Sequence, residues 1–346
     1  MLYLFELNHP KHYHQFKYIF KIIESNRDSF IVLARDKDVL LSLLKEDNIP
    51  FEIYGKRGNN LFSKLIFVPK ILFKYWGIIR KSKPNVIISK ASPYAAIIGK
   101  LFRIPTVITP DSEVVNLTNK IVVPLSTLVI TQKTYKNEFG KKHKRINGFF
   151  ETTYLHPNYF ISEEIDVFKE STESKQKKYF VLRFIGWDAN HDINQFGFSD
   201  EEKIKLVDFL LGYGKVIITS EKNLPNSLKK YVMLQHPSQI HHLLSFASIY
   251  IGDSQSMATE ACLLGTPSIR YNSFVGENDM SNFKILQEKY ELLYNCKNFE
   301  EVIYYAKRVI EDDNSKIKWR QNSNNYFKEI GDTNKEIFNI IKTVAV

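Results

Sequence analysis

Cysteine is scarce in this sequence, since its 346 residues contain only Cys262 and Cys296. Two thiols cannot build a disulfide framework, and no CxxC pair or mixed Cys/His spacing of the zinc-binding kind is present. We therefore expect two ordinary thiols in a reducing compartment, and no bound metal.

Long apolar runs are also missing. No stretch of about 18 uncharged apolar residues exists, so we expect no membrane-spanning helix. The opening run MLYLFEL has no basic region and is too short for a signal peptide, which makes it a predicted buried strand. These features favour a cytoplasmic protein, with the inner face of the cell membrane as a candidate location.

Glycine-rich phosphate loops are missing as well. The chain has neither a GxGxxG fingerprint nor a P-loop, which argues against NAD and ATP sites of those types. We expect no cofactor, so that any nucleotide ligand would be a substrate.

The charge that is present is mostly positive. The net charge of +10 favours anionic partners such as phosphorylated substrates, phospholipid or nucleic acid. The segment from Phe62 to Lys83 combines lysines with aromatic and aliphatic residues, which predicts a basic amphipathic helix in peripheral membrane contact. The alternative is a core helix whose lysines extend to solvent. Nucleic acid is not favoured, because the lysines are interleaved with apolar residues and form no compact basic face with stacking aromatics.

Short apolar runs alternate with helical patterns through most of the chain, which predicts parallel sheets covered by helices. A chain of this length suggests two domains. We predict an N-terminal Rossmann-like domain over 1–155, a polar linker over 156–178, a second Rossmann-like domain over 179–330, and a final helix over 331–346. The predicted strands are 2–7, 30–34, 51–54, 85–89, 106–109, 127–131, 179–184, 215–219, 231–234, 248–251 and 268–271.

The most informative segment runs from Ile249 to Arg270, IYIGDSQSMATEACLLGTPSIR. A strand ends at Gly252, a polar turn follows, and a helix ends before Gly265. The helix N-terminus would lie at the carboxyl end of a parallel strand, where its N–H groups and dipole can hold a diphosphate. The carboxylate of Glu260, one turn further, can accept the hydroxyls of a ribose. The alternative is a capped helix with a solvated glutamate. The nucleotide-binding residues predicted here are Asp253, Ser254, Gln255, Ser256, Met257 and Glu260.

This block resembles the DSGG…EEA…LGxP segment of the non-hydrolysing UDP-N-acetylglucosamine 2-epimerases, and the peptidoglycan N-acetylglucosaminyl transferase has a similar block. Over most of residues 1–295 the chain is similar to an uncharacterised archaeal and bacterial family related to both. The matching segments are 8–16 (NHPKHYHQF), 34–36 (ARD), 91–96 (ASPYAA), 111–113 (DSE), 154–157 (YLHP) and 252–277, which contains GDSQS, LGTPSIR and NSFVGE.

The resemblance implies an α/β protein of the GT-B fold, with two Rossmann-like parallel-sheet domains facing across a cleft and C-terminal helices. It implies that the domain over 1–155 is the acceptor domain and that the final helix over 331–346 crosses back to it. It also implies a nucleotide-sugar donor in the C-terminal domain, with the diphosphate on residues 254–258 and the ribose on Glu260. Gln255 and Ser256 replace the paired glycines of the epimerases, and their side chains narrow the approach to the phosphates.

Two further segments follow predicted strands of the first domain. The first loop carries three histidines, and His12 matches best the histidine in the first loop of the peptidoglycan transferase. It could act as a general base or donate to a phosphate oxygen; the alternative is a polar helix cap. Asp111 and Glu113 could take a proton from an acceptor or from a sugar C2, or could only cap a helix. We take His12, Asp111 and Glu113 as the catalytic candidates.

Three segments of the second domain complete the predicted donor site. They follow predicted strands, where ligands of open α/β sheets bind. Their predicted contacts are Arg183, Asp188 and His191, then Ser220 and Glu221, and finally Ser273 and Phe274.

The leading hypothesis is a metal-independent glycosyltransferase that moves a sugar from a nucleoside diphosphate, with a UDP-sugar favoured, to a lipid-linked or surface-polysaccharide acceptor. The alternative is a nucleotide-sugar 2-epimerase or hydrolase, which needs several acids around the sugar C2. A non-enzymatic nucleotide-binding or nucleic-acid-binding module is a further alternative.

Overall fold

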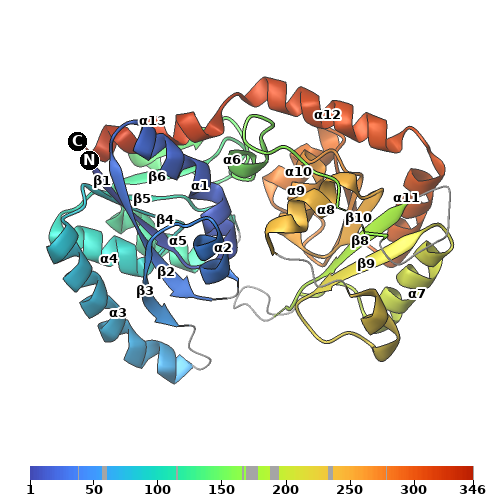
Figure 1. Ribbon diagram of the computed structural model, residues 1–346, viewed down its shortest axis with the longest axis horizontal. Helices are drawn as coiled ribbons and strands as arrows, with labels where there is room; N and C mark the ends of the chain where they lie inside the picture. Colours follow the sequence, from blue (N-terminus) through green and yellow to red (C-terminus); the bar gives the residue numbers. More distant parts are fainter. Residues whose placement is uncertain are drawn as a thin grey trace. The chain divides into compact units, whose positions relative to one another are not determined.

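A computed structural model describes residues 1–37, 39–56, 61–113, 116–165, 167–168, 178–187, 195–232, 237–277 and 279–345. The chain forms two compact units (Figure 1). The N-terminal unit comprises Met1–Tyr159 and Ile330–Val346, and the C-terminal unit comprises Phe160–Glu329.

A seven-stranded sheet forms the centre of the N-terminal unit. All its neighbouring strands are parallel, in the order β3-β2-β1-β4-β5-β6-β7. The order reverses between β1 and β4, which is the place where open α/β sheets bind ligands at the carboxyl ends of their strands. The strands are β1 (Leu2–Leu7), β2 (Ser29–Asp36), β3 (Phe51–Lys56), β4 (Val86–Ser89), β5 (Thr106–Ile108), β6 (Leu128–Gln132) and β7 (His143–Ile146).

Helices cover both faces of this sheet because its strands are apolar on both sides. In β1, Tyr3 and Phe5 pack into a core with α1, α2 and α13, whereas Leu4 packs on the opposite face with α3 and α4. The last helix, α13, lies beside α1 (Figure 1). The helices of this unit are α1 (Pro10–Ser25), α2 (Leu40–Glu46), α3 (Leu61–Ser82), α4 (Pro93–Phe102), α5 (Asn116–Leu125), η1 (Gly140–Lys142), α6 (Thr152–Leu155) and α13 (Thr333–Ala345).

The C-terminal unit has a five-stranded parallel sheet in the order β12-β11-β10-β8-β9. Its order reverses between β8 and β10, which places a second switch point there. The strands are β8 (Tyr179–Phe184), β9 (Lys215–Ser220), β10 (Ile249–Gly252), β11 (Ser268–Tyr271) and β12 (Tyr294–Cys296). The helices are α7 (Asp200–Leu211), η2 (Asn226–Tyr231), η3 (Pro237–Gln239), α8 (Ile240–Phe246), α9 (Gln255–Leu263), α10 (Ser281–Glu288), α11 (Phe299–Glu311) and α12 (Ser315–Ile330).

The structure differs from the strand predictions in a few places. Tyr231, predicted to begin a strand, ends the 3-10 helix η2, and Val232 forms only an isolated bridge to Ile218. The sequence did not predict β7 or β12, which are short edge strands with partly exposed residues. Residues 166 and 169–177 of the predicted linker lie outside the described residues, and its first part, up to Tyr159, belongs to the N-terminal unit.

The end of α9 depends on a glycine. Gly265 has φ +71°, and the N–H groups of Gly265 and Thr266 donate to the carbonyls of Cys262 and Ala261, as in a Schellman motif. A Cβ on Gly265 would lie 2.9 Å from the Cα of Arg320 on α12. This close approach lets the helix turn directly into β11.

Replacing Gly265 with alanine should therefore destabilise the protein by about 1–3 kcal/mol, because both the backbone conformation and the contact with α12 become strained. Thermal or urea unfolding followed by circular dichroism measures the change. Gly212→Ala is the matched control, because Gly212 ends α7 at φ −67° and its Cβ would meet only an ordinary contact of 3.5 Å. Equal midpoints for the two variants would contradict this account.

Candidate functional site

The carboxyl ends of β8 and β10 meet at the switch point of the C-terminal sheet, where Arg183 of β8 pairs with Gly252 of β10. The helix α9 begins directly after β10, and the Ser254 side chain caps it by accepting from the Met257 N–H at 3.4 Å. The first-turn N–H groups of an α-helix have no acceptor within the helix, so this end favours an anion. The predicted strand, turn and helix are therefore present at the predicted residues.

Asp253 holds the two strand ends together. It is 1% exposed, its Oδ1 accepts from the Ile185 N–H at 2.8 Å, and its carbonyl accepts from the Asn272 side chain at 3.0 Å. A Cβ on Gly197 would lie only 2.2 Å from its Oδ2, so glycine is required there for this close approach. Asp253 thus positions the loops around the α9 N-terminus.

Burial raises the pKa of Asp253 from 3.8 to about 6, and the hydrogen bonds from Ile185 and Trp187 only partly oppose this effect. A carboxyl that is harder to ionise in the folded state than in the unfolded chain makes the protein less stable once the pH exceeds its folded pKa.

Glu260 lies one turn into α9, and its side chain is nearly buried. Its Oε1 is 3.4 Å from Nε2 of His241, a buried histidine of α8 whose ring meets the edge of Phe160. His241 therefore orients the carboxylate that we predict to bind the ribose. Sequence reasoning missed His241, since it belongs to a different element and no local motif marks it.

Two loops that carry predicted donor contacts are fixed by their own hydrogen bonds. Ser273 accepts from the Phe196 N–H at 2.9 Å and donates to Gln195 at 2.6 Å, and the Phe274 ring lies 6.1 Å from that of Trp187. Arg270, near the end of β11, anchors the loop that follows this strand. Its side chain is fully buried, forms an ion pair with Asp279 and lies over the ring of Phe283.

At the end of β9, Glu221 pairs with Arg183 and accepts from the Gly186 N–H at 3.1 Å, which ties β9 to the loop after β8. The Ser220 hydroxyl donates to the Lys222 carbonyl at 2.9 Å and accepts from the Lys222 N–H at 3.3 Å. The predicted contacts Asp188 and His191 lie outside the described residues.

A second polar cluster lies at the β1/β4 switch point of the N-terminal sheet. We call it the lysine–carboxylate cluster, and it comprises Lys11, Lys90, Asp111 and Glu151. The Asp111 Oδ2 is 3.0 Å from both lysine Nζ atoms, and Lys11 also reaches Glu151 at 2.9 Å. Lys90 additionally packs over the Phe150 ring at 4.2 Å. Sequence reasoning found only Asp111 of these four.

The pKa shifts within the cluster indicate which of its side chains are charged. Burial opposes ionisation of Asp111, but Lys90 and Lys11 outweigh it and hold the pKa of Asp111 well below its usual range. Burial lowers the pKa of Lys90 to about 8 in spite of Asp111. Burial also acts to lower the pKa of Lys11, but Glu151 and Asp111 raise it overall. Asp111 is thus a paired carboxylate of very low basicity.

His12 lies next to this cluster at the start of α1. Burial, with Lys90 second, lowers its pKa well below the usual value, so the ring is neutral near pH 7. Its Nδ1 accepts from the Asn8 N–H at 3.3 Å. A neutral imidazole that accepts at Nδ1 carries its proton on Nε2, which makes His12 a hydrogen-bond donor in this arrangement.

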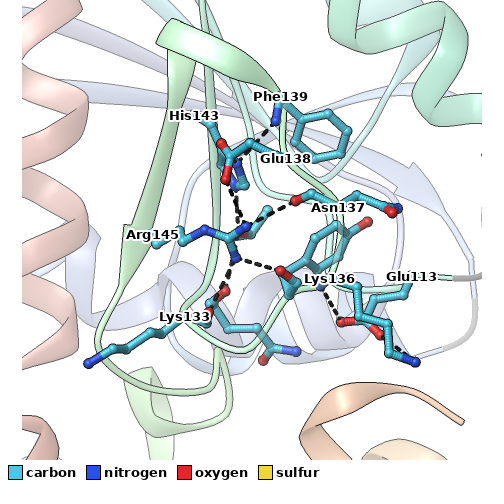
Figure 2. Close-up of polar contacts among 11 residues, drawn as sticks. Glu113, Lys133, Lys136, Asn137, Glu138, Phe139, His143 and Arg145 are labelled. Atoms are coloured by element: carbon cyan, nitrogen blue, oxygen red, sulfur yellow. Dashed lines mark hydrogen bonds and ion pairs between the residues drawn. The ribbon is translucent and has the colours of Figure 1, made fainter.

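Glu113, the third catalytic candidate, contacts the loop after β6. Its Oε1 accepts from the Lys136 N–H at 2.9 Å, and Figure 2 shows this contact beside a loop organised by Arg145. The Arg145 guanidinium donates to the carbonyls of Lys133 and Asn137 and to Glu138. The structure therefore brings His12 and Asp111 together, and Glu113 buttresses the neighbouring loop. Among the described residues, no three His, Cys, Asp or Glu side chains are grouped to hold a metal ion.

Two parallel sheets with these strand orders define a structural class, and solved structures of that class superpose over nearly the whole chain. The UDP-GlcNAc 2-epimerase from Neisseria meningitidis bound to UDP-GlcNAc has a TM-score of 0.68, with 13% identity over 99% of this chain and 100% of that one. The spinosyn rhamnosyltransferase SpnG complexed with spinosyn aglycone has a TM-score of 0.61, with 10% identity over 98% and 99%. The chain has the GT-B fold, and the sequence-based prediction of its fold is confirmed.

The chain belongs to the family described as "Protein of unknown function (DUF354)", whose model matches residues 3–339. One relative is the uncharacterized protein MJ0665 of Methanocaldococcus jannaschii, which is 22% identical over 330 residues that cover 87% of this chain and 89% of that protein. The resemblance to an uncharacterised family related to the epimerases is thereby confirmed.

The raised pKa of Asp253 leads to a test. Its contribution to stability is complete below the unfolded pKa of 3.8 and is lost as the pH rises through about 6. Relative to Asp253→Asn, the wild type should lose about 2–3 kcal/mol of unfolding free energy between pH 4 and pH 7. Urea unfolding at several pH values measures this difference. Asp208→Asn, at an exposed position of α7, should keep the pH dependence of the unfolding free energy that the wild type shows. If Asp253→Asn shows that same pH dependence, the assignment is refuted.

Proposed function

We propose that this protein is a glycosyltransferase that transfers a sugar from a nucleoside diphosphate, with a UDP-sugar favoured, to a lipid-linked or surface-polysaccharide acceptor. The observation that carries the proposal is the arrangement at the β8/β10 switch point. There the Ser254-capped N-terminus of α9 precedes, by one turn, a Glu260 carboxylate that is oriented by His241.

This arrangement suits both polar parts of a nucleoside diphosphate. The N–H groups and dipole of the α9 N-terminus would hold the diphosphate, and they would stabilise the charge that develops on it when the bond to the sugar breaks. Glu260 would accept from the ribose hydroxyls. Because backbone groups would supply this stabilisation, the proposed transfer is independent of a metal.

The acceptor is proposed to bind in the N-terminal unit, near the lysine–carboxylate cluster. Lys11 and Lys90 supply positive charge at the β1/β4 switch point, which suits a phosphate of a lipid-linked acceptor. His12 would donate from Nε2 to an acceptor oxygen. A role as general base would require the ring to change tautomer and lose the hydrogen bond from Asn8.

A nucleotide-sugar 2-epimerase or hydrolase is the alternative, favoured by the fold shared with an epimerase that binds UDP-GlcNAc. An epimerase removes a proton at the sugar C2 and therefore needs carboxylates that are available as bases. Asp111 is held by two lysines and Glu113 by the backbone of Lys136, which supports the transferase over the epimerase.

Nucleotide binding is the first test of this proposal. UDP, GDP, CDP, dTDP, ADP and CMP are compared by thermal unfolding, and a ligand at ten times its Kd should stabilise the protein by about 1.4 kcal/mol. Glu260→Gln and Glu260→Ala should lose this shift and still fold. Glu201→Gln, at an exposed site of α7, should keep it. If no nucleotide stabilises the folded wild type, both enzyme proposals fail.

The reaction is then assigned by its products. With a nucleotide-sugar alone, an epimerase would form the epimer and a hydrolase would release free sugar, whereas the transferase should release nucleoside diphosphate at an appreciable rate only when a membrane extract or polysaccharide acceptor is added. Formation of the epimer without acceptor would replace our proposal with the alternative.

The role of His12 has its own test. As a donor, it should be replaceable by glutamine, whose side-chain amide also donates, so His12→Gln should retain kcat/KM within about tenfold while His12→Ala loses more. If His12 instead acts as a general base, kcat/KM should fall by about 10²–10⁴-fold in both variants. Steady-state kinetics of the transfer separate the two roles, and equal losses in both variants would rule out the donor role.

A further inference from the structure

A long part of the N-terminal unit contains no acidic residue. Between Ile53 and Pro110 the sequence has no aspartate or glutamate, but it has eleven lysines and arginines. Most of this stretch forms α3 and α4, which pack side by side on one face of the sheet (Figure 1). The outer surfaces of these two helices therefore carry charge of one sign only.

The outer surface of α3 is apolar as well as basic. Its inner side buries Ile71 and Tyr75 against the sheet, as expected for a core helix. On its outer side the Phe73 side chain is 70% exposed and lies 5.3 Å from the ring of Trp76, over which the Arg80 guanidinium packs at 5.0 Å. The helix α3 thus combines a buried apolar side with an outer side that mixes basic and apolar residues.

The neighbouring helix α4 continues this surface, which the sequence pattern did not indicate. Leu101 is 70% exposed and Ile97 is 39% exposed, and Lys100 between them is exposed too. Lys100 also interacts with Lys142. Burial is the main cause of the lowered pKa of Lys142, and the positive charge of Lys100 is the second cause. We call Phe73, Trp76, Lys81, Ile97, Lys100 and Leu101 the α3–α4 surface.

We propose that the α3–α4 surface docks the protein onto an anionic phospholipid bilayer. Exposed aromatic and aliphatic side chains can enter the interfacial region of a bilayer, while the flanking lysines and arginines remain at the level of the acidic headgroups. The absence of any carboxylate on this stretch removes the repulsion that such headgroups would otherwise meet. Among the described residues, no helix is long and apolar enough to cross a membrane, so the proposed contact is with the surface of the bilayer.

A lipid surface fits these observations better than a nucleic acid. Nucleic acids are bound through phosphate contacts and base stacking, and neither process rewards isolated aliphatic residues such as Leu101 and Ile97. The proposal does not rest on the transfer reaction, because docking requires neither nucleotide nor acceptor, but it would bring a lipid-linked acceptor to the N-terminal unit.

The test is co-sedimentation of the full chain with vesicles of phosphatidylcholine mixed with phosphatidylglycerol, compared with pure phosphatidylcholine. The wild type should bind the anionic vesicles, and binding should weaken as salt is added. The double variants Phe73→Ser/Leu101→Ser and Lys81→Glu/Lys100→Glu should each weaken binding by about tenfold or more. All four positions are exposed, so the variants should fold, which circular dichroism verifies.

Matched controls in the C-terminal unit separate this surface from the effect of net charge. Lys229→Glu/Lys328→Glu makes the same change in charge at exposed sites, and Tyr304→Ser/Ile317→Ser removes apolar side chains that are 55% and 54% exposed. Both controls should bind vesicles like the wild type. The proposal is overturned if the wild type ignores anionic vesicles, or if the controls weaken binding as much as the α3–α4 variants. Because the assay contains no nucleotide, its failure would leave the proposed transferase activity untouched.

Discussion

The buried carboxylate of Asp253 is the group on which the geometry of the proposed donor site depends. A parallel sheet brings the ends of β8 and β10 to the same edge, but backbone pairing stops at Arg183 and Gly252. Beyond that point the hydrogen bonds of Asp253 to Ile185 and Asn272 fix the loops after β8 and β11 against the start of α9. The resulting pKa of about 6 records the energetic cost of keeping this carboxylate away from water.

The N-terminal unit uses charge differently at its own switch point. Its carboxylate, Asp111, is held by two lysines that are themselves largely buried. The lysines keep Asp111 ionised. Burial, with Lys90 second, lowers the pKa of His12, which leaves a neutral histidine that donates hydrogen bonds. One sheet edge is thus suited to the negative charge of a diphosphate through a helix N-terminus, and the other through lysine side chains. In the proposed transferase, the first would hold the donor diphosphate and the second a phosphate of the lipid-linked acceptor.

The helices on the two faces of the N-terminal sheet differ in how many apolar side chains they expose to solvent. The helices α1 and α13 bury aromatic and aliphatic residues against β1, whereas α3 and α4 present exposed apolar side chains among lysines. An outer surface of this kind is costly in water, since exposed aromatic and aliphatic groups gain from burial. A bilayer interface would bury those groups without burying the lysines.

Much of the fold could be predicted from the sequence because parallel strands that are buried on both faces read as short, nearly continuous apolar runs. The strands β1, β8 and β11 begin and end at the predicted residues. The edge strands β7 and β12 were missed, since partly exposed edges carry no such run. Tyr231 was misassigned because it begins the apolar run 231–234 (YVML), of which residues 233–234 lie outside the described residues. The helix α9 begins at Gln255, within one residue of the start near Ser256 that the sequence predicts. Its end before Gly265 was predicted correctly, because a glycine at positive φ is a requirement of the local backbone.

By itself, then, the sequence determined the two parallel sheets and the strand–turn–helix segment around Ser254, since these follow from local hydrophobic periodicity and capping. Only the tertiary structure decided which side chains meet. It placed His241 against Glu260 and Lys90 against Asp111, and it packed α4, which carries Leu101, beside α3, which carries Phe73. Those pairs are separated in the chain by between 19 and 28 residues, being 241 and 260, 90 and 111, and 73 and 101. Their relative positions depend on strand order and helix packing, which no local pattern of residues encodes.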